Sequence, residues 1–118
     1  MRILVVEDEA TIQRLLADVL AAPGVNIDAV GTCGEALTLL GTHPYEWIVL
    51  DNTLPDGKGI DLIRTARAAG CRVVMATSDG HCPEFSKKAV QLGAERVFVK
   101  PFSIRDLARY IHGACASA

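Results

Sequence analysis

Three acidic residues stand immediately after two apolar runs of the sequence. Glu7 and Asp8 follow the run at 3–6. Asp51 follows the run at 47–50. If these runs are neighbouring strands, the three carboxylates come close together, and their repulsion raises their pKa values unless a cation neutralises them. Oxygen ligands in a partly hydrated acidic site suit Mg²⁺, or Mn²⁺ in its place, so a divalent metal site is predicted.

Two further polar residues follow apolar runs in the same way. Thr77 comes directly after the run at 73–76. Lys100 comes directly after the run at 97–99. A lysine supplies a fixed cation and a threonine supplies a hydroxyl donor, and both suit the oxygens of a phosphoryl group. With Asp51 as the nucleophile, these residues form a candidate catalytic group for phosphoryl transfer, a reaction that needs positioning and charge neutralisation.

The apolar runs alternate with five segments that have helical periodicity. The runs are short and nearly continuous, as expected of strands buried on both faces of a sheet. The expected strands are residues 3–6, 26–30, 47–50, 73–76 and 97–99. The run at 26–30 has a weaker, alternating pattern, which favours a place at the sheet edge.

Capping and breaking residues mark where the helices begin and end. Pro23 stops the first helix, and Thr32 with Glu35 forms a capping box at the start of the second. Pro83 suits the first turn of the fourth helix, and Ser103 suits the N-cap of the last. Strands that alternate with helices in this way predict an α/β fold with a doubly wound parallel sheet. Ligands of such folds bind beyond the carboxyl ends of the strands, where all the residues named above converge.

Composition narrows the class of protein further. The chain has 118 residues, of which 50% are hydrophobic, so a single domain over 1–118 is expected. The formal net charge is −2, and no run of Lys and Arg is longer than Lys87-Lys88. These values give no reason to expect direct binding of nucleic acid. No apolar stretch approaches the roughly 20 residues that a membrane span requires.

The four cysteines show no metal-binding or redox spacing. They are Cys33, Cys71, Cys82 and Cys115, and none forms a C-x-x-C pair. We therefore expect free thiols that act as small buried hydrophobic residues in a reducing compartment, which predicts a cytoplasmic location.

These motifs together resemble the receiver domain of two-component response regulators. The matching segments run in order through nearly the whole chain: Ile3-Leu-Val-Val-Glu-Asp-Glu9, Val49-Leu-Asp-Asn-Thr-Leu-Pro55 with Gly59, Met75-Ala-Thr77, Gly93-Ala94 and Val99-Lys-Pro-Phe102. The resemblance implies five parallel strands in the flavodoxin-like order 2-1-3-4-5, with five helices.

The resemblance also implies the roles of the site residues. Asp51 would be phosphorylated, and Lys100 would contact the phosphoryl group. The peptide bond between Lys100 and Pro101 would be cis. Mg²⁺ would be held by Asp8 and Asp51, by the backbone carbonyl of Thr53, and by Glu7 through water. The donor would be a histidine kinase or a histidine phosphotransfer protein, and the output would pass to an effector domain or a separate output protein. Such a domain catalyses only its own phosphorylation and slow dephosphorylation, so it is not classed as an enzyme.

Several positions depart from the family pattern. Glu7 stands where Asp is commoner, and either Thr77 or Ser78 could be the switch hydroxyl. The switch position that is usually aromatic, three residues before the lysine, is Val97. Phe98 cannot replace it, because neighbouring residues of a strand face opposite sides. We therefore expect the loop and helix around 79–85 to carry the conformational change, helped by the conformational freedom of Gly80.

The residues disfavour three alternative functions. An aspartyl-phosphate hydrolase of related topology has a second Asp two residues after the nucleophile, where this chain has Thr53. A flavodoxin-like nucleotide binder needs amides after the first strand, where Glu7-Asp8-Glu9 would repel a phosphate. A degenerate receiver used only for docking would lack part of the acceptor site, and no part is missing. Met1 lies close to the first strand, which argues against excision from the end of a hybrid kinase, and the end at Ala118 leaves open whether an output domain follows.

Overall fold

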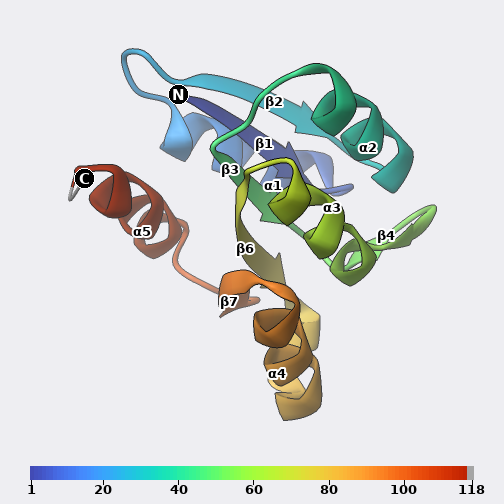
Figure 1. The fold of residues 1–118 in the computed structure, drawn as a ribbon. Helices are drawn as coiled ribbons and strands as arrows, with labels where there is room; N and C mark the ends of the chain where they lie inside the picture. The colour runs from blue at the N-terminus through green and yellow to red at the C-terminus, as the bar shows by residue number, and fades with distance from the viewer. Residues whose placement is uncertain (117–118) are drawn as a thin grey trace.

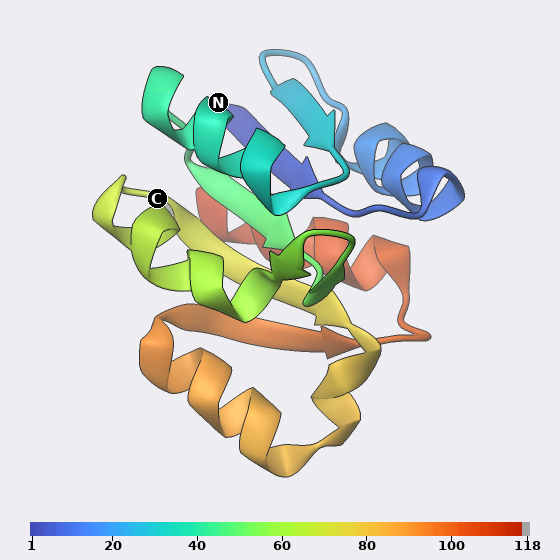
Figure 2. The same cartoon turned by 90° about the vertical axis from the view of Figure 1, so that its right-hand side faces the viewer.

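One parallel sheet runs through the middle of the protein, whose computed structural model describes residues 1–116 (Figures 1 and 2). Its strand order is β2-β1-β3-β6-β7, which is the predicted order 2-1-3-4-5 when only these five strands are counted. The strands are β1 (Arg2–Val6), β2 (Asn26–Val30), β3 (Trp47–Leu50), β6 (Arg72–Thr77) and β7 (Ala94–Val99). The weakly patterned strand β2 lies at the edge, as expected. The short strands β4 (Thr53–Leu54) and β5 (Gly57–Lys58) form a separate antiparallel hairpin.

Five helices cover the two faces of the sheet. They are α1 (Ala10–Leu20), α2 (Cys33–Thr42), α3 (Ile63–Ala68), α4 (Pro83–Leu92) and α5 (Ile104–Ala116), with two 3₁₀ turns, η1 (Gly59–Leu62) and η2 (Ser78–His81). Helices α1 and α5 pack on one face, and α2, α3 and α4 pack on the other (Figure 2). The expected five-helix, doubly wound α/β fold is therefore confirmed. None of these helices, within the part of the chain that the structure describes, is long and apolar enough to cross a membrane.

Alternate residues of each strand supply the two cores. Ile3 and Val5 of β1 pack beneath α1 and α5, whereas Leu4 and Val6 face the other three helices. This alternation is the period-2 pattern of a strand that is buried on both faces.

The helix α2 is capped from two directions. The Thr32 hydroxyl accepts a hydrogen bond from the Glu35 amide at 3.1 Å, which is the threonine half of the predicted capping box. The Glu35 carboxylate instead accepts from the Thr32 hydroxyl at 3.0 Å and from the Gly31 amide at 3.4 Å. In addition, the Asp56 carboxylate accepts hydrogen bonds from the amides of Cys33 (2.7 Å) and Gly34 (2.9 Å). This second cap joins the β4-β5 hairpin to α2, and it was not predicted because Asp56 lies more than 20 residues away in the sequence.

Three local expectations need correction. Strand β7 begins at Ala94 rather than at residue 97, since Ala94 already pairs with Val73 before an irregularity in the ladder. The segment after β6 is not an open loop but the 3₁₀ turn η2. Cys82 is exposed at the N-cap of α4, although Cys33 and Cys71 are buried as expected, and the side chain of Cys115 lies outside the described residues.

Candidate functional site

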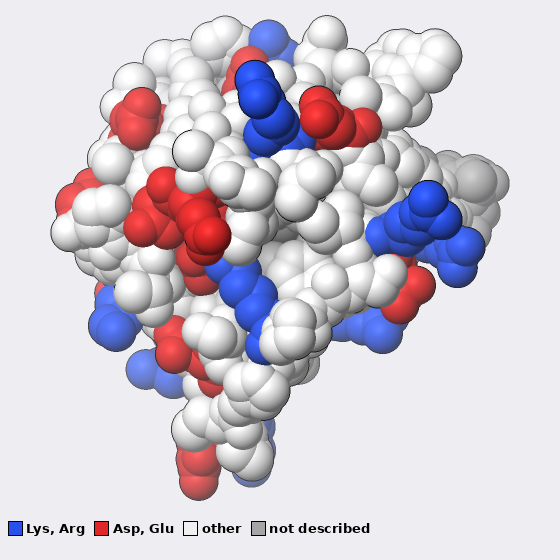
Figure 3. Space-filling model, turned by 180° about the vertical axis from the view of Figure 1, so that it is seen from behind, with Lys and Arg blue, Asp and Glu red and all other residues white. Residues whose placement is uncertain are grey.

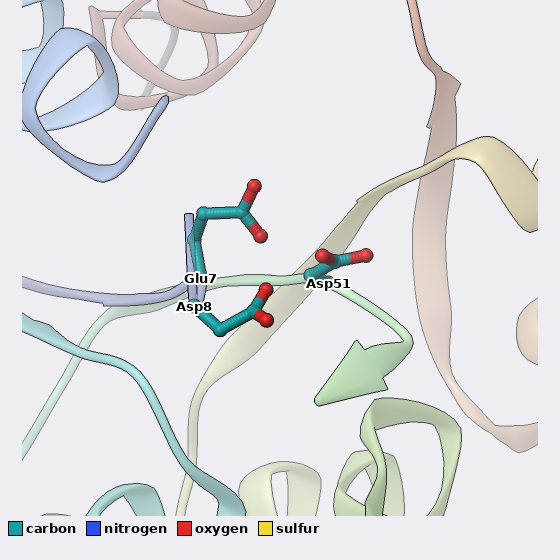
Figure 4. Close-up of side chains that lie close together, drawn as sticks. All are labelled: Glu7, Asp8 and Asp51. Atoms are coloured by element: carbon teal, nitrogen blue, oxygen red, sulfur yellow. The ribbon is translucent and has the colours of Figure 1, made fainter. Parts of the chain in front are cut away.

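Three carboxylates meet at the carboxyl edge of the sheet (Figure 4). Glu7 and Asp8 follow β1, Asp51 follows β3, and these two strands are paired in the sheet. One oxygen from each carboxylate lies within 4.8 Å of the others. The expected convergence of these side chains is therefore observed.

Lys100 reaches into this cluster from the end of β7. Its Nζ atom lies 2.7 Å from Glu7 Oε1 and 3.3 Å from Asp51 Oδ2. The peptide bond between Lys100 and Pro101 is cis, as the family resemblance implied. The side chain is mostly buried, and burial opposes its charge, but the hydrogen bond to Glu7 and the charge of Asp51 raise the pKa of Lys100 overall.

Glu7 is the most buried of the three acids. Only 1% of its surface is exposed, and burial together with a hydrogen bond to Asp51 raises its pKa to about 8, although Lys100 acts in the opposite direction. The pKa of Asp51 is lowered instead: burial raises it, but the hydrogen bond from Glu7 and the charge of Lys100 outweigh that effect. Of the two acids, Glu7 therefore holds a shared proton more readily than Asp51 does.

The cluster fits a divalent cation. Glu7 Oε2 is buried and has no hydrogen-bond partner within the part of the chain that the structure describes, which is an unfavourable state for a buried oxygen. Asp8 is exposed, so the cluster is open to water on one side. Hard oxygen ligands with room for water are what Mg²⁺ and Mn²⁺ require, and a cation would satisfy Glu7 Oε2 in place of the shared proton.

The loop after Asp51 is held rigidly by backbone contacts. The Asn52 amide donates to Asp51 Oδ1 at 2.7 Å, and the Asn52 carbonyl accepts from the Gly59 amide at 2.7 Å. A Cβ atom placed on Gly59 would lie 1.8 Å from the backbone oxygen of Asp51. Only glycine therefore fits at position 59, and this close approach explains the glycine of the motif.

Of the two candidate hydroxyls, Thr77 faces Asp51. Thr77 is completely buried at the end of β6, and a hydrogen bond between its side chain and Asp51 contributes to the lowered pKa of Asp51. Ser78 is exposed. The exposed Thr53 directs its hydroxyl to Asp79 Oδ2 at 3.3 Å, away from the carboxylate cluster.

The switch position Val97 lies against the turn η2. Val97 belongs to the core under α4, whereas Phe98 packs with α5 on the opposite face, as the strand period predicted. A Cβ atom placed on Gly80 would lie 3.0 Å from Val97 Cγ1 and 2.7 Å from Val99 Cγ2. The φ angle of Gly80 is not positive, so in this state the position requires the small size of glycine rather than a left-handed backbone.

Two residues of the site were missed by the sequence analysis. Asn52 is buried, with its side-chain oxygen bonded to the Ile60 amide and its side-chain nitrogen bonded to Asp79. Asp79 was included only in the segment 79–85 that was expected to carry the conformational change. Its polarity beside an expected strand end was a signal, but its partner lies 27 residues away in the sequence.

Surface charge is distributed in small groups. On the face shown in Figure 3, acidic side chains gather near a basic one, and Lys and Arg side chains are scattered among uncharged surface. That face carries no continuous basic stripe of the kind that follows a nucleic-acid backbone.

Comparison with known proteins gives one consistent result. The model of the response regulator receiver domain family matches residues 3–112. The transcriptional regulatory protein CusR of Escherichia coli K12 is 34% identical over 109 residues, which is 91% of this chain and 48% of CusR. The two-component response regulator PhoP of Pseudomonas aeruginosa is also 34% identical over 109 residues, with the same shares of 91% and 48%.

A solved structure agrees with these relatives. The receiver domain protein (CheY-like) from Methanospirillum hungatei JF-1 is 27% identical, with a TM-score of 0.88 over 98% of this chain and 94% of that chain. The chain spans about half the length of the curated relatives it matches.

Proposed function

The chain belongs to the response regulator receiver domain family, and from this membership we propose that Asp51 is the residue that accepts the phosphoryl group. Receiver domains of this family are phospho-acceptors in two-component signalling. The observation that carries the assignment is the position of Asp51, bonded at Oδ1 by the Asn52 amide and approached at Oδ2 by Lys100. The donor is a histidine kinase or a histidine phosphotransfer protein.

The residues around Asp51 support a direct displacement. An Asp51 carboxylate oxygen forms the new bond to phosphorus while the bond from phosphorus to the donor's histidine breaks, and the imidazole leaves with the bonding electrons. The low pKa of Asp51 keeps it ionised and able to attack. Lys100 is close enough to offset the charge on the transferred group, and the Thr77 hydroxyl can donate to one of its oxygens.

The acidic cluster supports a metal-dependent reaction. Asp8, Asp51, Glu7 through water and the backbone carbonyl of Thr53 would hold Mg²⁺ or Mn²⁺. When bound, the ion would neutralise phosphoryl oxygens next to three carboxylates. Without it, the repulsion between these carboxylates and an incoming phosphoryl group would oppose the transfer.

Thr77 is the better candidate for the switch hydroxyl, because it is buried beside Asp51 while Ser78 is exposed. Val97 offers no ring that could rotate, so we assign the conformational change to η2 and the start of α4. A β-branched side chain has few χ1 positions.

The rest of the signalling route follows from this role. The chain is a single receiver domain over 1–118 that works in the cytoplasm, is not an enzyme beyond its own phosphorylation and dephosphorylation, and does not itself bind nucleic acid. It passes the signal to an effector domain or an output protein. A hydrolase function lacks support, because Thr53 offers no carboxyl group for acid–base catalysis.

Intact-mass measurement tests the acceptor directly. With Mg²⁺ and acetyl phosphate, the wild-type protein should gain the mass of one phosphate, and Asp51→Asn should gain none. Asp61→Asn removes an equal charge from η1 outside the carboxylate cluster and should be labelled like the wild type. Undiminished labelling of Asp51→Asn would overturn the assignment.

A further inference from the structure

One carboxylate joins the turn η2 to the loop that follows Asp51. Asp79 Oδ2 accepts a hydrogen bond from Asn52 Nδ2 at 2.6 Å and another from the Thr53 hydroxyl at 3.3 Å. The Asp79 amide also donates to the Thr77 hydroxyl at 3.3 Å. Asp79 therefore contacts both residues after the acceptor and the hydroxyl beside it.

The bond from Asn52 has a fixed direction. Because Asn52 Oδ1 accepts from the Ile60 amide at 3.0 Å, its NH₂ group must point toward Asp79. Asn52 is only 4% exposed, so water cannot readily replace the carboxylate as its partner. The backbone amide of Asn52 donates to Asp51 Oδ1. Asn52 is therefore the single residue that links Asp79 to the acceptor.

The far side of η2 is tied to the elements that would transmit a movement. Gly80 lies against Val97 and Val99, and its carbonyl accepts from the Ser86 hydroxyl of α4 at 3.1 Å. His81 Nε2 lies 3.1 Å from the backbone oxygen of Lys100. If the contact between Asp79 and Asn52 breaks and η2 moves, the contacts that η2 makes with α4 and β7 must change as well.

We propose that Asp79 is a charge-sensitive latch, which holds η2 against the acceptor loop before phosphorylation and releases it afterwards. The proposal rests on Asp51 being the acceptor. A phosphoryl group carries about −1.5 to −2 charges in place of the single charge of the Asp51 carboxylate, so phosphorylation makes the acceptor more negative. A second anion, the Asp79 carboxylate, is held near it through Asn52 and Thr53, and like charges at short range repel.

Two substitutions separate the charge of the latch from its hydrogen bonds. Asp79→Ala removes both, so amide hydrogen exchange in residues 78–82 should rise about tenfold or more before phosphorylation, the factor expected for a charge-assisted hydrogen bond. Asp79→Asn keeps an oxygen that can accept from Asn52 and Thr53 but removes the charge. Its exchange in 78–82 should stay low both without and with beryllium fluoride, an analogue of the phosphoryl group.

The wild type and the matched control Asp61→Asn should both show low exchange that rises when beryllium fluoride binds. Unchanged exchange in Asp79→Ala overturns the latch, and a wild-type response in Asp79→Asn overturns its sensitivity to charge. Phosphate uptake from acetyl phosphate is measured by mass on the same protein preparations without beryllium fluoride. A wild type that takes no phosphate overturns the proposed function and the trigger together. Normal uptake combined with unchanged exchange in Asp79→Ala, or with a wild-type response in Asp79→Asn, overturns only the latch.

Discussion

The ammonium group of Lys100 is closer to Glu7 than to Asp51, at 2.7 Å against 3.3 Å. The lysine therefore donates a hydrogen bond to the buried acid that follows β1 while it remains within reach of the acceptor. Replacement of Lys100 leaves Glu7 without this partner and leaves Asp51 without its nearest cation.

Lys100→Met should slow the phosphorylation of Asp51 by a factor of about 100, the usual effect of removing one preorganised group that stabilises charge. The measurement is the rate of phosphate uptake from acetyl phosphate at saturating Mg²⁺. Lys87→Met, on the exposed surface of α4, changes the net charge equally and should leave the rate unchanged. Equal rates for Lys100→Met and the wild type would exclude a direct role for this lysine.

Divalent metal should stabilise the fold, because it relieves the repulsion among the three carboxylates and satisfies Glu7 Oε2. At 100 times its dissociation constant, a ligand of the native state adds about 2.7 kcal/mol to the free energy of unfolding. Thermal melts with and without Mg²⁺ measure the effect. Asp8→Ala should lose the shift, and Glu9→Gln, a neighbouring acid outside the cluster, should retain it. No shift in the wild type would mean that the cluster does not bind Mg²⁺.

The affinity for Mg²⁺ should increase as the pH rises toward 8. Burial and the bond to Asp51 raise the pKa of Glu7 from its ordinary value of 4.5 to about 8 in the metal-free protein. The native state then binds this proton more tightly than the unfolded chain, so Glu7 lowers the metal-free stability progressively as the pH rises between these two values. The metal must displace the proton, so its binding weakens at lower pH.

Calorimetric titration of Mg²⁺ at about pH 6 and at about pH 8.5, on either side of the raised pKa, tests this dependence. Glu7→Gln cannot lose a proton and should show a flatter pH profile. Equal affinities of the wild type at the two pH values would contradict the assignment of the proton to Glu7.

Gly80→Ala should destabilise the protein by about 1–3 kcal/mol, the usual cost of forcing a methyl group into packed atoms. The new Cβ would lie 2.7 Å from Val99 Cγ2, and a valine methyl group cannot swing away as the end of a long side chain can. Gly41→Ala is the matched control, because a Cβ there would meet nothing within 4 Å and position 41 is helical. That variant should gain about 0.5–1 kcal/mol. Urea denaturation compares the two, and equal stabilities would show that η2 does not pack tightly on β7.

The strands and the edge where the site lies could be predicted because the informative patterns are local, whereas the strand order was implied by the family resemblance. Each continuous apolar run, such as 3–6 or 73–76, predicts a buried strand from its own residues alone. The carboxyl ends of parallel strands then lie at one edge of the sheet. Glu7, Asp51 and Lys100 were found for this reason: each directly follows such a run.

The contacts that hold the site could not be predicted in the same way. Asp56 caps α2 and Asp79 binds Asn52, and both contacts join residues that are far apart in the sequence. They could not be predicted because an Asp in a turn commonly forms hydrogen bonds with the neighbouring backbone instead. Gly80 is similar, since its role depends on the side chains of β7 opposite it. These contacts depend on how turns, strands and helices pack in three dimensions, and a local sequence pattern does not indicate this packing.

The close contact between Gly59 and Asp51 has a consequence for experiments on libraries of variants. Any side chain at position 59 meets the backbone oxygen of Asp51 at 1.8 Å, so substitutions there disturb the folded loop and the acceptor at once. A mutational scan scored for folded yield should deplete this position as strongly as one scored for phosphorylation. Lys100 should behave differently, with much stronger depletion in the second scan than in the first. The ratio of the two scores at each position would separate residues that build the acceptor loop from residues that act on the phosphoryl group.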